Sequence, residues 1–223
     1  MEKMSPKITG LKTQKRNPKR VNVYIDGEFA FGLSRFTAAW LSVGQELEEE
    51  KINNLLEQDA GEVAYQRALN YLSYRPRTEQ EVRRNLQKKD ISEEIIEQTL
   101  ERLRKNSLVN DLDFVKFWVE DRVTFRPRGK RAMRYELIKK GIDRKVIDQA
   151  FSEITINEEK MALQLARKQA GKYASDTEFD FRRKMSAYLG RRGFSYEDIR
   201  SVIEIILKET QLDNSGTDRT YRP

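Results

Sequence analysis

Residues 86–96 read LQKKDISEEII, and the pattern returns as LIKKGIDRKVI at residues 137–147 and as LGRRGFSYEDI at residues 189–199. The three copies are offset by 51 and 52 residues. Each copy holds a leucine, two basic residues, a turn residue, an apolar residue and a short polar residue. Self-similarity at a fixed period of this size indicates tandem structural repeats.

Each copy predicts the end of one helix, a tight turn and the start of the next helix. A helix often ends at a residue with positive φ, usually glycine. The residues expected there are Asp90, Gly141 and Gly193. A short side chain with an oxygen then caps the following helix. The expected caps are Ser92, Asp143 and Ser195. The two consecutive basic residues before each turn suit the negative end of a helix.

A further helix is predicted before each pair, at about residues 62–73, 111–123 and 157–172. Arg-Pro-Arg follows the first two of these helices, at 75–77 and 126–128, and proline cannot continue them. Thr78 and Glu81 form a candidate capping box. We therefore predict a mainly α protein with three tandem three-helix repeats. Neighbouring repeats would share a core and form an elongated, curved array.

The N-terminal region predicts a small β-structure. Two alternating runs flank Asp26-Gly27, which is a strong hairpin signal, and residues 8–14 could add a third strand. Ser34 is expected to cap a short helix that ends at Trp40, and residues 48–58 predict another helix. The aromatic residues are expected to form the core of this sheet, with nucleic-acid stacking as the alternative. They are Tyr24, Phe29, Phe31, Phe36 and Trp40.

These patterns predict five segments. Residues 1–60 form the β-hairpin and short helices, and a polar, disordered tail closes the chain at 210–223. Between them, the three repeats are expected at 61–110, 111–156 and 157–209.

The composition excludes several kinds of chemistry. The 223 residues include no cysteine and no histidine, so disulfides, thiolate or histidine metal sites and histidine catalysis are excluded. No phosphate-binding glycine motif is present, so we expect neither an enzyme nor a cofactor. No apolar run approaches the roughly 20 residues that a membrane span needs. We expect a cytoplasmic monomer that does not bind membranes.

The net charge of +7 suggests an acidic partner, and residues 122–145 are the most basic window, at +8. Several cations there fall at the start of a predicted helix, where the helix dipole disfavours them unless an anion is near. We expect an acidic partner, such as a DNA backbone, to supply that anion. The candidate contact residues are Arg75, Arg77, Arg126, Arg128, Lys130, Arg131 and Arg134. A solvated charged surface is the alternative.

The order and period of these motifs resemble the RecX family of recombinase regulators. The resemblance covers about residues 62–207, and it is carried by NDLDFV at 110–115, RPRTEQEV at 75–82 and ELIKKGI at 136–142. The N-terminal segment looks like the extension found in members from Gram-positive bacteria. Departures are Asp90 in place of the usual glycine and a third repeat without Arg-Pro-Arg.

The resemblance implies regulation and no catalytic residues. Members of this family bind the RecA recombinase filament along its helical groove. They limit filament growth and restrain its ATPase, strand-exchange and coprotease activities in DNA repair, and some bind single- or double-stranded DNA.

A DNA-binding protein that acts without a recombinase is the alternative. Residues 137–151 have helix-turn-helix character, which would place a helix in the major groove. Arg144 and Lys145 begin that helix, but Asp148 and Glu153 follow them. The preceding helix is more basic, which suits contacts with a backbone or a protein partner better than base recognition.

Overall fold

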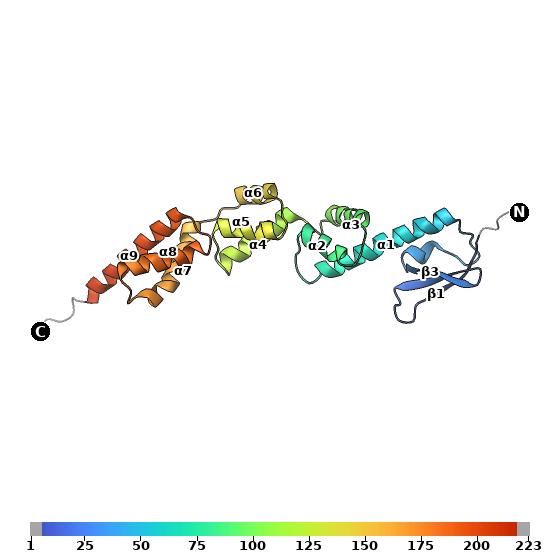
Figure 1. Ribbon diagram of the computed structural model, residues 1–223, viewed down its shortest axis with the longest axis horizontal. Coiled ribbons are helices and arrows are strands. Elements are labelled where there is room, and N and C mark those ends of the chain that lie inside the picture. The colour runs from blue at the N-terminus through green and yellow to red at the C-terminus, as the bar shows by residue number, and fades with distance from the viewer. Residues whose placement is uncertain (1–5, 218–223) are drawn as a thin grey trace. The chain divides into compact units, whose positions relative to one another are not determined.

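A computed structural model describes the backbone of residues 6–217 and the side chains as far as Thr210. The chain divides into two compact units, Met1–Val109 and Asn110–Pro223. The described residues are mainly helical, with a small sheet near the N-terminus, as predicted (Figure 1).

The first unit begins with a three-stranded antiparallel sheet of β1 (Ile8–Thr13), β2 (Arg20–Ile25) and β3 (Glu28–Ser34), in the order β1-β2-β3. Asp26 and Gly27 form the hairpin turn with φ of 47° and 90°, which confirms the predicted turn. The sheet covers a small aliphatic core. Its buried residues are Ile8, Val23, Leu33, Ala38, Leu41 and Leu47.

The prediction that the N-terminal aromatics form this core is wrong for the most exposed of them. Phe29, Phe36 and Trp40 are 58%, 69% and 86% exposed. A shift in register between Val23 and Tyr24 breaks the alternation of β3 near Phe29. The short helix η1 (Thr37–Trp40) turns Ala38 and Leu41, three residues apart, toward the core. Tyr24 and Phe31 are half-buried.

The two helices predicted at 48–58 and 62–73 are one continuous helix, α1 (Glu49–Leu72). Only Gly61 interrupts the helix-forming residues, and one glycine costs about 1 kcal/mol, which packing readily offsets. Asp59 in the middle of α1 is buried and accepts hydrogen bonds from Ser34 N and from Arg20 Nη2. The boundary expected at residue 60 therefore falls inside a helix that the sheet and the first repeat share.

The first repeat continues with α2 (Glu79–Gln87) and α3 (Glu93–Lys105). The capping box is confirmed, since Glu81 N donates to Thr78 Oγ1 at 3.1 Å and the Glu81 carboxylate accepts from Thr78 N. Val82, Leu86 and Leu100 are fully buried against α1.

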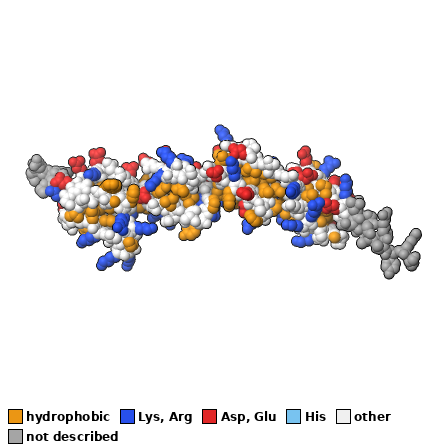
Figure 2. Space-filling model, turned by 180° about the vertical axis from the view of Figure 1, so that it is seen from behind, with side chains coloured by type: hydrophobic (Ala, Val, Ile, Leu, Met, Phe, Trp, Pro, Cys, Tyr) orange, Lys and Arg blue, Asp and Glu red, His pale blue; other side chains and the backbone are white. Residues whose placement is uncertain are grey.

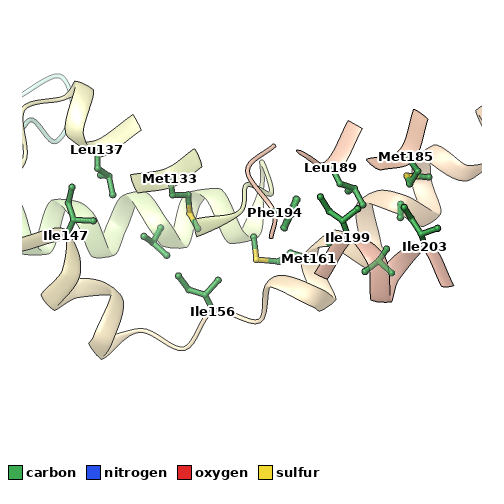
Figure 3. Close-up of a cluster of buried hydrophobic side chains, with 14 of the residues drawn as sticks. Met133, Leu137, Ile147, Ile156, Met161, Met185, Leu189, Phe194, Ile199 and Ile203 are labelled. Atoms are coloured by element: carbon green, nitrogen blue, oxygen red, sulfur yellow. The ribbon is translucent and has the colours of Figure 1, made fainter. Parts of the chain in front are cut away.

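The second unit holds the other two repeats. Its helices are α4 (Asp111–Thr124), α5 (Lys130–Lys139), α6 (Arg144–Glu153), α7 (Glu158–Ala170), η2 (Gly171–Tyr173), α8 (Glu178–Gly190) and α9 (Tyr196–Thr217). One buried cluster runs through both repeats (Figure 3). Met133 and Leu137 of the second repeat lie in the same cluster as Met185 and Leu189 of the third. Neighbouring repeats in this unit therefore share a core.

The three turns adopt the predicted conformation. Asp90, Gly141 and Gly193 have φ of 56°, 86° and 85°. Asp143 and Ser195 cap α6 and α9 by accepting from Lys145 N and Asp198 N. Ser92 occupies the cap position of α3 without a side-chain hydrogen bond. The sequence pattern thus predicted the backbone of all three turns.

The polar tail expected at 210–223 begins as helix, because α9 extends to Thr217. The rest of that expected tail, residues 218–223, lies outside the described residues. Within the described part of the chain, no helix is long and apolar enough to cross a membrane.

Candidate partner-binding surface

The two Arg-Pro-Arg segments are alike in sequence but differ in their partners. In the first repeat, Arg75 makes a two-pronged ion pair with the Glu81 carboxylate, at 3.0 and 3.1 Å. Arg77 is half-buried and lies 4.1 Å from the centre of the Tyr71 ring. Both arginines therefore already have contacts within their own repeat.

The second repeat lacks the residues that hold the first segment. Gly129 and Ala132 stand where the first repeat has Thr78 and Glu81. No capping box can form, and Arg126 has no equivalent carboxylate beside it. Arg126 is exposed and has no ion-pair partner among the residues that the structure describes.

A carboxylate from the third repeat replaces the missing cap of α5. Lys130 N donates to Glu158 Oε1 of α7 at 2.8 Å. This anion sits at the positive end of the α5 dipole, where it offsets part of the local cost of the clustered cations. The expectation that only an external partner supplies anions here is therefore wrong in part.

Backbone contact fixes the same point of the second unit. Gly129 N donates to Arg192 O at 2.9 Å, and a Cβ added at Gly129 would lie 2.2 Å from Gly193 O. The α5 start is thus pressed against the turn between α8 and α9. The basic residues that follow Gly129 are held on a rigid part of the unit.

The remaining candidates divide into paired and unpaired cations. Arg134 pairs with Asp148 of α6, and Arg128 Nε lies 3.9 Å from Glu136 Oε1. Arg131 is exposed, and its one hydrogen bond to a described residue is to Gly190 O, at 3.4 Å. In the described part of the chain, the side chain of Lys130 has no ion pair. The available cations of this surface are Arg126, Lys130 and Arg131, which we call the α5 basic surface.

Sequence reasoning missed a packed polar cluster next to this surface. The Arg122 Cζ atom lies 3.9 Å from the centre of the Trp118 ring. The Glu136 carboxylate accepts hydrogen bonds from both Arg122 Nε and Trp118 Nε1, at 2.9 and 3.1 Å. The Lys140 Nζ atom lies 4.6 Å from the centre of the same ring. Only 13% of the Arg122 side chain is exposed, so Arg122 stabilises this cluster and is not available to a partner. The spacing of Trp118 and Arg122, four residues apart on one helix, was the signal for this pair.

Four domain descriptions of one family match the chain in order. They are the regulatory protein RecX N-terminal domain at residues 6–48, and the first, second and third three-helix domains of RecX at 64–103, 110–150 and 157–203. The matched ranges leave out residues 49–63, which form the first part of α1.

Curated relatives and solved structures agree. "Regulatory protein RecX" of Clostridium acetobutylicum is 32% identical over 91% of this chain and 97% of its own length. The protein of the same name from Bacillus cytotoxicus is 31% identical over 96% of this chain and 82% of its own. A crystal structure of regulatory protein RecX matches 89% of this chain and 99% of its own, with a TM-score of 0.74 and 30% identity. RecX from Lactobacillus salivarius matches 70% of this chain and 99% of its own, with a TM-score of 0.62. This chain belongs to the RecX family of regulatory proteins.

Proposed function

We propose that this chain is a non-enzymatic regulator that binds the RecA recombinase filament and inhibits its ATPase, strand-exchange and coprotease activities during DNA repair and recombination. The ordered match to all four RecX domains carries this proposal. The regulator acts as a monomer in the cytoplasm, without a cofactor.

The α5 basic surface is the contact we propose with the filament. Its three cations lack carboxylate partners among the described residues and lie at or before the start of α5, where the helix dipole favours a further anion. Acidic groups in the filament groove, or the phosphates of the bound DNA, fit this requirement. Because exposed charges are screened by salt, binding is expected to weaken as salt concentration rises.

The first prediction concerns recombinase ATPase on single-stranded DNA. The wild-type chain is expected to lower the steady-state rate. The triple substitution of Arg126, Lys130 and Arg131 to alanine is expected to raise the concentration needed for half-inhibition by roughly 100-fold, because three charged contacts at about 1 kcal/mol each sum to about 3 kcal/mol.

A matched control replaces Lys160, Lys168 and Lys172 with alanine, which changes the net charge equally within the same unit. These lysines are exposed and have no ion pair in the described part of the chain. The control is expected to inhibit like the wild type. Equal inhibition by both triple variants would show that the α5 basic surface does not contact the filament. No inhibition by the wild type would contradict the proposed function itself.

A DNA-binding protein that uses the α5–α6 pair stays the second candidate. Arg144 and Lys145 at the start of α6 are exposed and have no ion pair among the described residues. The two acids of α6 are held within the unit, Asp148 by Arg134 and Glu153 by Lys116. Salt-dependent binding to duplex DNA without recombinase, lost in an Arg144 and Lys145 double variant, would favour this candidate.

A further inference from the structure

The first unit contains a basic cleft that none of the seven candidate contact residues lines. It lies between the β1–β2 connection, the end of β3 and the C-terminal half of α1, and its volume is about 580 Å³. The residues that matter for its chemistry are Asn17, Lys19, Arg35, Phe36, Arg67 and Asn70. We call it the β–α1 cleft.

The walls of the cleft are fixed by buried polar contacts. Asp59 of α1 binds Ser34 N and Arg20 Nη2, which ties the end of β3 to the helix. Arg35 N donates to Lys19 O at 2.8 Å, so the two residues lie side by side across the strand edge. The cleft is therefore built into the fold and does not depend on its own exposed side chains.

Acids near the cleft are already neutralised. Arg20 is paired with buried Asp59 at 3.0 Å. Glu62, which also lines the cleft, binds Arg102 at 2.8 Å and accepts from Gln66 Nε2 at 3.0 Å.

Three cations of the cleft have no such partner. Within the described residues, Lys19, Arg35 and Arg67 take part in no ion pair, and all three are exposed. Lys15 and Arg16 on the β1–β2 connection add two more positive charges nearby. Figure 2 shows Lys and Arg side chains along the lower edge of the N-terminal part of the chain, while acids gather along its upper edge. This concentration of positive charge attracts an anionic ligand.

An aromatic ring lies among these cations. Phe36 lines the cleft and is 69% exposed, although a phenylalanine of a small unit is expected to be buried. The side-chain amides of Asn17, Gln66 and Asn70 line the same cleft. Exposed rings that stack on bases, placed among cations that meet phosphates, are the usual means of binding single-stranded nucleic acid.

We infer that the β–α1 cleft binds single-stranded nucleic acid, with Lys19, Arg35 and Arg67 meeting the phosphates and Phe36 stacking on an unpaired base. An acidic peptide would satisfy the cations but would not need the ring. Duplex DNA keeps its bases stacked on one another, so its bases are not available to Phe36. The inference needs no recombinase and stands apart from the proposed regulation.

The test is binding of the full chain to a fluorescein-labelled oligothymidylate of about twelve nucleotides, followed by fluorescence anisotropy at low salt. The alanine variant of Lys19, Arg35 and Arg67 is expected to bind at least about tenfold more weakly. The slope of log affinity against log salt should fall by about two, since each phosphate contact on a single strand contributes about 0.7. Phe36→Ala should weaken binding by about fivefold or more.

Two controls separate charge from base stacking. A variant with Lys51, Lys88 and Lys89 replaced by alanine has the same charge change in the same unit, and none of these lysines lines the cleft. It should bind within about twofold of the wild type. An abasic strand of the same length keeps the phosphates, so its weaker binding should be unchanged by Phe36→Ala.

Three outcomes would overturn the inference. The first is equal affinity of the two triple variants. The second is an abasic strand, a duplex or polyglutamate that binds the wild type as tightly as oligothymidylate, which would identify a general anion site. The third needs no variant: photocrosslinking of a bromodeoxyuridine strand to the wild-type chain should label the peptide that contains Phe36, and labelling only elsewhere would exclude the cleft.

Discussion

The second and third repeats pack closely at Gly129 and Gly193, and neither position has room for a side chain. A Cβ at Gly129 would lie 2.2 Å from Gly193 O, and a Cβ at Gly193 would lie 2.4 Å from Ala132 Cβ. Gly193 also has φ of 85°, which residues with a side chain rarely adopt. One glycine therefore allows close packing, whereas the other serves both packing and turn geometry.

Gly129→Ala is predicted to destabilise the second unit by about 2 kcal/mol or more, because the backbone of the α8–α9 turn must move away. Gly61→Ala is the control. Gly61 lies inside α1 with open space around its Cβ position, so alanine there should stabilise the chain by about 0.5–1 kcal/mol. Thermal unfolding followed by circular dichroism measures both. A Gly129→Ala protein that melts like the wild type would show that this contact is not tight.

Arg75 and Arg126 show what a motif can and cannot predict. The repeat in the sequence correctly placed both at the end of a helix. Their different availability depends on the residue six positions later, which is Glu81 in the first repeat and Ala132 in the second. That difference can be read from the sequence. The capping of α5 by Glu158, which lies 28 residues beyond Lys130, depends on a tertiary contact that the sequence does not show.

At the scale of helices, local pattern predicted the turns well and the N-terminal region less well. Turn residues act through their own backbone, so Asp90, Gly141 and Gly193 were found from spacing alone. The single helix α1 was not, because the buried contacts of Asp59 with the sheet stabilise a continuous helix across Gly61. The exposed ring of Phe36 was missed for the same reason, since the sequence does not show that aliphatic residues already fill the core.

The pair of α8 and α9 gives a prediction that depends on pH. Arg182 Nη1 lies 2.7 Å from Glu204 Oε1, and this hydrogen bond lowers the pKa of the Glu204 carboxyl below its ordinary value. A carboxyl with a lower pKa in the folded state contributes stability that is complete above its unfolded pKa, about 4.3, and is lost as pH falls through its folded pKa. The group is solvent-exposed, so the effect is small and sensitive to salt.

Glu204→Gln is therefore predicted to lower the thermal midpoint slightly near neutral pH at low salt. The difference from the wild type should shrink at about pH 3, where the Glu204 carboxylate becomes protonated. It should also shrink at about 1 M salt, where the ion pair is screened. Glu120→Gln is the control, since Glu120 is exposed on α4 and has no ion pair among the described residues. A difference that stays constant across pH would show that Glu204 acts through packing rather than charge.

At the scale of the whole chain, the buried clusters follow the division into two units. Among the described residues, the sheet core and the first-repeat core both lie within Met1–Val109, while the shared core of the second and third repeats lies within Asn110–Pro223. The sequence repeat does not show this grouping, because it presents three similar copies. Each unit has about 110 residues, which is enough for a core that folds alone.

The two units are therefore predicted to unfold independently. Leu137 and Leu86 occupy the same position of the repeat, and both are fully buried, one in each unit. Leu137→Ala should destabilise the second unit by about 2–5 kcal/mol and speed amide hydrogen exchange in α5, α6 and α8, with exchange in β2 and α2 unchanged. Leu86→Ala should give the opposite pattern. If either variant speeds exchange throughout the described chain, the two units form one cooperative structure despite their separate cores.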